Sequence, residues 1–320
     1  MSAPEEAGPE VLAGLRDRVL AEVGRVVVGQ DEVAEGILAG LVVGGHVLLE
    51  GVPGVAKSLL AETVARTLAI DFARVQFTPD MLPSDITGTM MLRGGELSFR
   101  PGPIFTNVLL ADEINRTPPK TQAALLEAMQ EGQVSVEGES HPLPEPFLVL
   151  ATQNPIDYEG TYPLPEAQLD RFVAKLAVGY PDEPQERAML SLGHRGLRPT
   201  GLAEVRAVAG PADLLAARSE LDAVVVSDAV RGYVVALVRR TRDLPSVSLG
   251  ASPRAAVHLL ALARATAALA GRGFVIPEDA AAVAPIVLRH RIVMSPEAEL
   301  EQYTSDDAVR TALAEVPIPR

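Results

Sequence analysis

Residues 47 to 58 read Val47-Leu48-Leu49-Glu50-Gly51-Val52-Pro53-Gly54-Val55-Ala56-Lys57-Ser58. A short apolar run breaks into a glycine-rich loop that ends in Lys-Ser, and a helical pattern follows the loop. A buried strand, a glycine-rich loop, a lysine and a hydroxyl ahead of a helix are the parts of a P-loop. These residues therefore predict a phosphate-binding loop between a strand and a helix.

Each part of this loop has a chemical role. Glycines let backbone N–H groups turn inward toward phosphate oxygens, and the N-terminus of the next helix adds unpaired N–H groups. Lys57 is expected to reach the β- and γ-phosphates, and the Ser58 hydroxyl is expected to bind Mg²⁺. The residues expected to contact the nucleotide here are Pro53, Gly54, Val55, Ala56, Lys57, Ser58 and Leu59.

Ala56 departs from the generic P-loop pattern, which has glycine at this position. A Cβ in the left-handed region of backbone space costs roughly 1–2 kcal/mol. We therefore predict that Ala56 has a negative φ.

The composition narrows the class of protein. The chain has 320 residues, no cysteine and a formal net charge of −14. The lack of cysteine excludes a disulfide scaffold and a cysteine nucleophile, and it suits a cytoplasmic location. The acidic balance argues against nucleic-acid binding. The longest apolar run, residues 37–49, is too short to cross a bilayer, so we expect no membrane insertion.

Apolar periodicity divides the chain into two parts. Residues 1–10 are polar and acidic, which predicts a disordered tail. Residues 11–184 alternate between strand and helix patterns and predict a parallel α/β domain, with hairpins near 87–100 and 133–143. Residues 185–320 contain helical patterns only, which predicts a small all-α domain. The expected helices there are 185–194, 211–218, 227–242, 252–270 and 277–288.

Asp112 and Glu113 end the buried-type strand 107–113. Parallel sheets bind ligands at the carboxyl ends of their strands, and the P-loop is expected at the same edge. Phosphoryl transfer needs an acidic residue for Mg²⁺ and a residue that activates water. Asp112 fits the first role, together with Ser58, and Glu113 fits the second; the alternative is a solvated acid pair.

Three further polar residues stand where they can assist. Asn154 ends another buried strand and can hold the attacking water, or it simply starts a turn with Pro155. Arg171 lies on a short helical pattern and can stabilise charge in a neighbour's site, or it forms a salt bridge with Asp170 or another neighbour at the surface. Arg254 falls in the first turn of a helix, where a cation is disfavoured unless an anion such as phosphate lies nearby.

Four motifs together resemble the MoxR family of AAA+ ATPases. They are Gly51-Val-Pro-Gly-Val-Ala-Lys57-Ser58, Leu110-Ala-Asp112-Glu113-Ile-Asn115-Arg116, Ala151-Thr-Gln-Asn154-Pro155 and Leu164-Pro-Glu-Ala-Gln-Leu-Asp-Arg171-Phe172. The resemblance implies a P-loop AAA+ αβα sandwich followed by a small α-helical lid domain. It also accounts for Ala56, because MoxR-type loops carry alanine there.

The resemblance assigns further roles. Lys57 and Ser58 form the Walker A pair, and Asp112 and Glu113 the Walker B pair. Asn154 is sensor 1, Arg171 the arginine finger and Arg254 sensor 2, while Val28, Gly29 and Gln30 border the adenine. ATP and Mg²⁺ are the implied ligands. A homo-oligomeric ring, usually a hexamer, a partner with a von Willebrand A domain and a client protein are also implied, as for a chaperone-like factor.

Other functions remain open at this stage. A nucleotide-gated scaffold would bind ATP with little turnover, although Glu113 and Arg171 argue against it. A magnesium-chelatase-like AAA+ subunit would share the same motifs. A GTPase is disfavoured, because Pro155 stands where the N-K-x-D motif has the lysine that lies along guanine.

Overall fold

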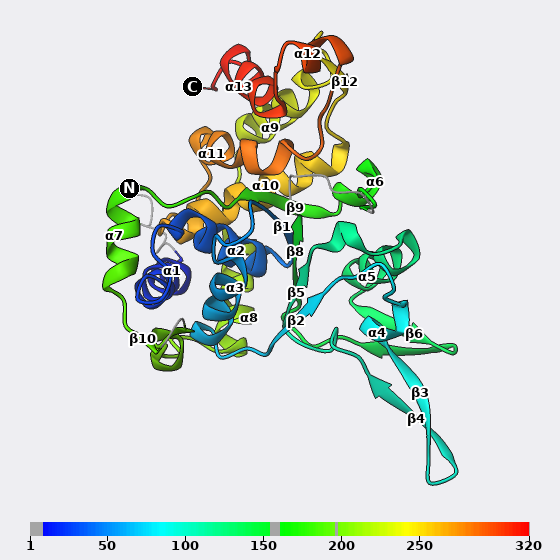
Figure 1. The fold of residues 1–320 in the computed structure, drawn as a ribbon. Coiled ribbons are helices and arrows are strands. Elements are labelled where there is room, and N and C mark those ends of the chain that lie inside the picture. Colours follow the sequence, from blue (N-terminus) through cyan, green and yellow to red (C-terminus); the bar gives the residue numbers. More distant parts are fainter. Residues whose placement is uncertain (1–8, 154–160, 196–197, 320) are drawn as a thin grey trace.

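The computed structural model describes residues 9–153, 161–195 and 198–319, and its centre is a five-stranded parallel sheet (Figure 1). The strands are β1 (His46–Glu50), β2 (Phe72–Gln76), β5 (Val108–Asp112), β8 (Leu148–Gln153) and β9 (Phe172–Ala177). They lie in the order β2-β5-β8-β1-β9, and all neighbouring pairs are parallel. The predicted α/β class is confirmed.

Helices cover both faces of this sheet. Val47 and Leu49 of β1 pack on the side of α1 (Glu10–Val23), α2 (Asp31–Val43) and α3 (Lys57–Thr67). Leu48 packs on the opposite side, with α4 (Pro83–Thr87) and α5 (Pro119–Glu131). Strands buried on both faces need apolar residues throughout, which is why β1, β5 and β8 are apolar runs. Apart from His46, which begins β1, polar residues in these strands appear only near their carboxyl ends.

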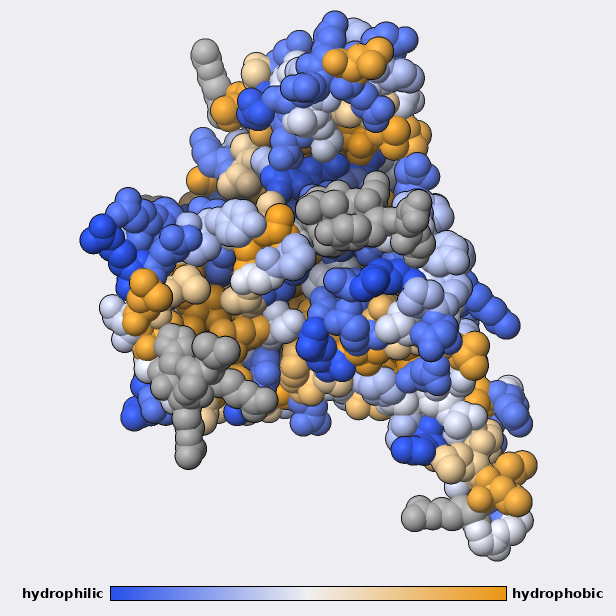
Figure 2. Space-filling view, viewed as in Figure 1, coloured by the Kyte–Doolittle hydropathy of each residue, from blue (hydrophilic) through white to orange (hydrophobic). Residues whose placement is uncertain are grey.

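Two hairpins extend from the sheet domain, as the sequence predicts. They are β3 (Gly88–Arg93) with β4 (Glu96–Pro101), and β6 (Gln133–Val136) with β7 (Glu139–Pro142). The first hairpin projects away from the body, and its end exposes Leu92 and Leu97 (Figures 1 and 2). His141 stacks on Phe99 at a centroid distance of 3.9 Å, so the two hairpins touch.

The C-terminal part of the chain is mainly helical. Its helices are α7 (Glu183–Ser191), α8 (Pro211–Ala223), α9 (Asp228–Arg240), α10 (Pro253–Leu269), α11 (Pro277–Leu288), α12 (Pro296–Leu300) and α13 (Ser305–Glu315). The helix α6 (Glu166–Leu169) and the 3-10 turns η1 (Ile114–Arg116) and η2 (Gly201–Glu204) complete the set described here. The helices α12 and α13 were not predicted.

The prediction of helices alone after residue 185 is wrong. The structure contains the strand pairs β10 (His194–Arg195) with β11 (Arg198–Pro199), and β12 (Val247–Leu249) with β13 (Val293–Met294). Strands of two or three residues are too short to show a period of two in the sequence.

One apolar core joins most of the molecule. It includes Leu15 and Ile37 on the sheet side and Leu221 and Leu262 in the later helices. The helix α8 packs against α1 and α2, so the domain division at residues 184 and 185 stays a prediction. Within the described ranges, every helix is too short or too polar to span a bilayer.

Candidate functional site

The P-loop connects β1 to α3, as predicted. Gly51 passes so close to the last sheet strand that a Cβ would lie 2.3 Å from the carbonyl oxygen of Val178. Gly54 has a φ of +89°, and a Cβ there would meet open space. Gly51 is therefore fixed by packing, whereas Gly54 is fixed by backbone conformation. The loop places backbone N–H groups next to the N-terminus of α3, which is the arrangement that binds anions.

The predicted negative φ of Ala56 is wrong. Its φ is +62° and its ψ is +23°, which is the left-handed region, and it is the residue before α3. The chain must reverse between the loop and the helix within one residue, so the path of the loop overrides the preference of alanine. A cost of roughly 1–2 kcal/mol stays at this point of the loop.

Lys57 lies between the loop and the acidic pair. Its Nζ donates a hydrogen bond of 2.6 Å to the carbonyl oxygen of Gly51. Burial lowers the pKa of the Lys57 ammonium, and the charges of Asp112 and Glu113 oppose this effect. The ammonium is therefore a partly desolvated positive charge, which attracts phosphate more strongly than a solvated one.

Asp112 is buried at the end of β5 and is held from two sides. Its Oδ1 accepts a hydrogen bond of 2.6 Å from Thr152 Oγ1 on β8. Its Oδ2 accepts hydrogen bonds from the Arg74 guanidinium on β2, at 2.6 and 3.1 Å. The carboxylate is thus held in one orientation, because each oxygen has a fixed donor.

Glu113 follows directly in an unusual conformation. Its φ of +56° is left-handed, and its N–H donates to Thr152 Oγ1 at 2.8 Å. The carboxylate oxygen Oε2 accepts hydrogen bonds from Gln76 and Arg116, each at 2.9 Å. A non-glycine residue in this region of backbone space is typical of functional sites.

Two adjoining pockets surround these groups. The polar pocket measures about 380 Å³ and is lined by Pro53, Gly54, Ala56, Lys57, Ser58, Leu59, Arg74, Gln76, Asp112 and Glu113. The apolar pocket measures about 390 Å³, and its wall includes Val26, Val27, Val28, Gln30, Val55, Tyr180 and Leu190. Gly54, Ala56 and Leu59 line both pockets. A ligand with an apolar end and an anionic end fits this pair.

The residues predicted to border an adenine lie at the apolar pocket. Val28 and Gln30 form part of its wall, and Gln30 Nε2 donates to the carbonyl oxygen of Gly179 at 3.1 Å. Gly29, between them, has a φ of +77°, and a Cβ there would meet the side chain of Gln185 at 2.4 Å. Gly29 therefore sets the backbone path of the loop, while Val28 and Gln30 form part of the pocket wall.

The oxygen atoms of the polar pocket suit Mg²⁺. Ser58 and Asp112 both line it, and hydroxyl and carboxylate oxygens are ligands that this ion prefers. Among the described residues, no group of three or more His, Asp or Glu side chains forms a metal cage. Mg²⁺ bound with substrate phosphates needs only one or two protein ligands, so the pair fits.

The other predicted residues lie outside these pockets or outside the described residues. Asn154 falls in the second group. Arg171 lies between α6 and β9, and its Nη1 donates to the carbonyl oxygen of Leu126 at 2.9 Å. Arg254 is in the first turn of α10, where the Asp170 carboxylate lies 3.7 Å from its Nη1. A protein carboxylate thus lies near Arg254, where the sequence suggested phosphate.

Arg74, Gln76 and Thr152 were missed in the sequence. In the parallel register Gln76 lies beside Asp112, and Ala111 lies beside Ala151, which brings Thr152 next to Asp112. The sequence does show polar residues at alternate positions of the predicted strand 72–77 and near the end of the predicted strand 146–154. These residues could have indicated contacts with the acidic pair. The contacts that these residues make can be inferred only when the order of the strands in the sheet is known.

Comparisons with known proteins agree with this geometry. Residues 46–174 match the family described as ATPase family associated with various cellular activities (AAA), and residues 239–312 match the AAA lid domain. The chain is 45% identical to the chaperone MoxR1 of Mycobacterium tuberculosis over 336 residues, covering 100% of this chain and 88% of that protein. It is 33% identical to the protein MoxR of Methylorubrum extorquens, covering 98% of each.

A solved structure is similar over the whole chain. It is the crystal structure of a protein of Cytophaga hutchinsonii described as a candidate ATPase, with 42% identity and a TM-score of 0.89. It covers 97% of this chain and 98% of that one. The sheet order, the P-loop, the acidic pair and the lid are thus found together with full-length similarity to MoxR proteins. The chain belongs to the MoxR family of AAA+ ATPases.

Proposed function

We propose that this chain binds ATP with Mg²⁺, hydrolyses it to ADP and phosphate, and uses the cycle as a chaperone-like remodelling or assembly factor. The observation that carries the proposal is the polar pocket, in which Lys57, Asp112 and Glu113 meet beside an apolar pocket of similar size. Family membership supports ATPase activity in general.

The two pockets are proposed to bind different parts of the nucleotide. The apolar pocket suits a purine ring, since Val28 and Leu190 offer flat hydrophobic contact. The loop N–H groups and the N-terminus of α3 suit the phosphates, with Lys57 on the terminal ones. Ser58 and Asp112 would hold Mg²⁺, which neutralises phosphate charge when it is bound.

Glu113 is the group that would act on water. Its carboxylate lines the polar pocket and can accept the proton of a water molecule that attacks the terminal phosphorus. Thr152 fixes the backbone N–H of Glu113 and the carboxylate of Asp112 at once. The two acids are thereby kept in a constant relation, which positions the base relative to the phosphates.

The site is proposed to be completed by another subunit. An arginine is the group that stabilises charge in phosphoryl transfer. Arg74, which lines the polar pocket, is bound to Asp112, and Arg171 and Arg254 line neither pocket. We therefore include a homo-oligomeric ring, with six subunits as the expected number, in the proposal. A von Willebrand A domain partner and a client protein are included through the family resemblance; MoxR1 is named a chaperone.

Glu113→Gln tests the proposed function. Turnover should fall by about 100-fold or more, because the general base is lost, while ATP affinity stays close to that of the unaltered protein. Glu299→Gln, at an exposed position of α12, is the matched control and should change neither. Equal turnover in Glu113→Gln and the unaltered protein would contradict the assignment. Binding without turnover in the assembled, unaltered protein would instead favour a nucleotide-gated scaffold.

A further inference from the structure

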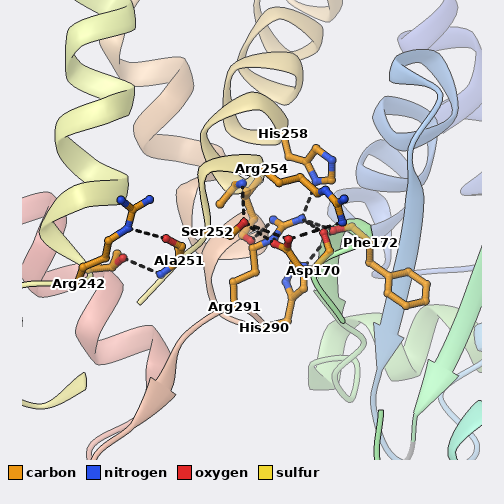
Figure 3. Close-up of polar contacts among 12 residues, drawn as sticks. Asp170, Phe172, Arg242, Ala251, Ser252, Arg254, His258, His290 and Arg291 are labelled. Atoms are coloured by element: carbon orange, nitrogen blue, oxygen red, sulfur yellow. Dashed lines mark hydrogen bonds and ion pairs between the residues drawn. The ribbon is translucent and has the colours of Figure 1, made fainter. Parts of the chain in front are cut away.

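Asp170 is the point where the lid meets the backbone that carries Arg171. The side chain of Asp170 accepts hydrogen bonds from Ser252 Oγ at 2.9 and 3.0 Å and from Arg291 Nε at 2.9 Å. The Nη1 of Arg254 lies 3.7 Å from the same carboxylate. Figure 3 shows these groups converging on Asp170 from α10 and from the segment that follows α11.

Arg291 is the fixed member of this cluster. Its side chain is 1% exposed, and burial lowers the pKa of the guanidinium to about 10, while the charge of Asp170 opposes this effect. Its Nη2 donates to the carbonyl oxygens of Asp170, at 3.2 Å, and of Phe172. The carbonyl groups of the residues before and after Arg171 are therefore bound to a single buried cation. A buried cation needs a charged partner, and Asp170 is that partner.

Arg254 is the weakly bound member. Its side chain is 46% exposed, and its contact with Asp170 is longer than a hydrogen bond. Exposed ion pairs of this kind are weak, so a second anion can draw the guanidinium away from Asp170. Asp170 itself would stay in place, because Arg291 and Ser252 keep their hydrogen bonds to it.

The cluster carries an excess of positive charge. Two arginines share one carboxylate, and the nearby His258 and His290 add no charge at neutral pH. Burial and the charge of Arg291 lower the pKa of His258 to about 4 and that of His290 well below its usual value. Arg171 follows Asp170 directly in the chain, so this part of the subunit suits an anion supplied from outside.

We propose that Asp170 is a positioning residue for arginines that act in the neighbouring subunit's site. Through Arg291 it fixes the backbone on both sides of Arg171, and through its carboxylate it holds Arg254 near that backbone until a phosphate of the neighbour's nucleotide attracts both arginines. This inference rests on the proposed function, since it needs a shared ATP site. It assigns Asp170 a role in the adjacent site, although Asp170 does not line either pocket of its own subunit.

The first measurement compares Asp170→Asn with the unaltered full-length protein. Asparagine keeps the shape of the side chain but removes the charge that binds Arg291 and Arg254. The specific ATPase rate of the assembled variant should fall by roughly tenfold or more, as for a displaced arginine finger. The dissociation constant for ATP should change by less than about twofold, because binding uses the subunit's own pockets. Asp222→Asn, an exposed carboxylate on α8, is the matched control and should leave both unchanged.

The decisive step mixes Asp170→Asn with Glu113→Gln in equal amounts. Asp170→Asn subunits keep a complete Glu113 site, and Glu113→Gln subunits keep intact positioning of Arg171 and Arg254. Random mixing puts half of the intact sites beside an intact arginine, so the mixture should reach about a quarter of the unaltered rate per mole of protein. Each variant alone should stay far below that value. Arg171→Ala mixed with Glu113→Gln should behave in the same way.

Three outcomes would count against the proposal. If Arg171→Ala complements Glu113→Gln but Asp170→Asn does not, Asp170 acts within its own subunit and the inference is wrong, while the proposed function stands. If neither complements, the shared site is wrong and the inference is lost with it. If Asp170→Asn fails to fold, Ser252→Ala replaces it, since that change removes the hydroxyl that donates to Asp170 and caps α10, but it removes no charge. Ser252→Ala should show a smaller loss that the same mixture restores, and a loss without restoration would overturn the inference.

Discussion

Gln76 Nε2 donates a hydrogen bond of 2.9 Å to Glu113 Oε2, from the last residue of β2 to the residue that follows β5. Arg116 donates to the same oxygen from the other side. A carboxylate oxygen that accepts two such bonds must give up one of them before it can turn toward another partner. The proposed general base is therefore restrained by its own subunit.

Gln76→Met removes one of the two restraints and keeps the length of the side chain. We expect the ATPase rate at saturating ATP to rise by roughly threefold to tenfold, since a hydrogen bond to a charged group is lost. ATP affinity should stay the same. The measurement is steady-state turnover, with Gln130→Met on the exposed side of α5 as the control. A slower Gln76→Met protein would mean that Gln76 orients Glu113 for catalysis.

Ala56→Gly tests the strain in the P-loop. Glycine adopts a φ of +62° without the cost that alanine bears, but it gains more freedom in the unfolded chain. The free energy of unfolding should rise by about 0.5–1 kcal/mol, the difference between these two terms. Urea unfolding measures it. Ala216→Gly on the exposed face of α8 should show the opposite sign, a loss of about 0.5–1 kcal/mol. If Ala56→Gly and Ala216→Gly both lower the free energy of unfolding, Ala56 is not strained in the folded protein.

Buried histidines predict a loss of stability on acidification. Burial lowers the pKa of His46 to about 4, and its Nε2 lies 2.9 Å from the carbonyl oxygen of Met129 while Nδ1 accepts from the Val149 N–H. Because the folded pKa lies below the unfolded value of 6.5, the unfolded chain binds more protons between pH 6.5 and pH 4. Stability is therefore full above pH 6.5 and falls as the pH drops toward 4.

The effect of His46 alone should be about 2 kcal/mol between pH 7 and pH 5. Urea unfolding at the two pH values measures the drop, and His46→Gln supplies the comparison. That variant is expected to be less stable at pH 7 but to lose less on acidification. If both proteins lose stability equally, His46 does not titrate in this window.

Asp112→Asn tests the proposed Mg²⁺ site. The neutral amide keeps the hydrogen bond from Thr152 but offers the ion no charge, so half-maximal turnover should need roughly tenfold more Mg²⁺ or beyond. Chelation with EDTA should abolish turnover in the unaltered protein, and added Mg²⁺ should restore it. Asp222→Asn should keep the Mg²⁺ dependence unchanged. Turnover that survives chelation would contradict the site.

The sequence predicted those parts of the site that local pattern controls. The apolar run of β1, the glycines and Lys57-Ser58 are contiguous, and so are the buried run of β5 and its two acids. Each of these two segments can be identified from its local sequence without knowledge of the fold. The parallel sheet followed from the alternation of strand and helix patterns, which is typical of parallel pairing.

The contacts that the sequence did not predict join residues that are distant from one another in the chain. Arg74 and Thr152 contact Asp112 only because β2 and β8 flank β5, which no local pattern states. Arg291 reaches Asp170 across 121 positions, through the docking of the lid. Ala56 failed for a different reason: the path of the loop imposed a conformation that residue preference disfavours.

The central claim is that catalysis needs an arginine from a second subunit, and the specific ATPase rate measured against protein concentration tests it most directly. The rate per mole of protein should climb as the protein assembles, and Arg171→Ala should abolish the climb. Sedimentation over the same concentrations would establish where assembly occurs. A specific rate that is non-zero and flat while the protein passes from monomer to oligomer would contradict the claim. Each subunit would then hold a complete site, and Arg171, bound to the Leu126 carbonyl, would be structural.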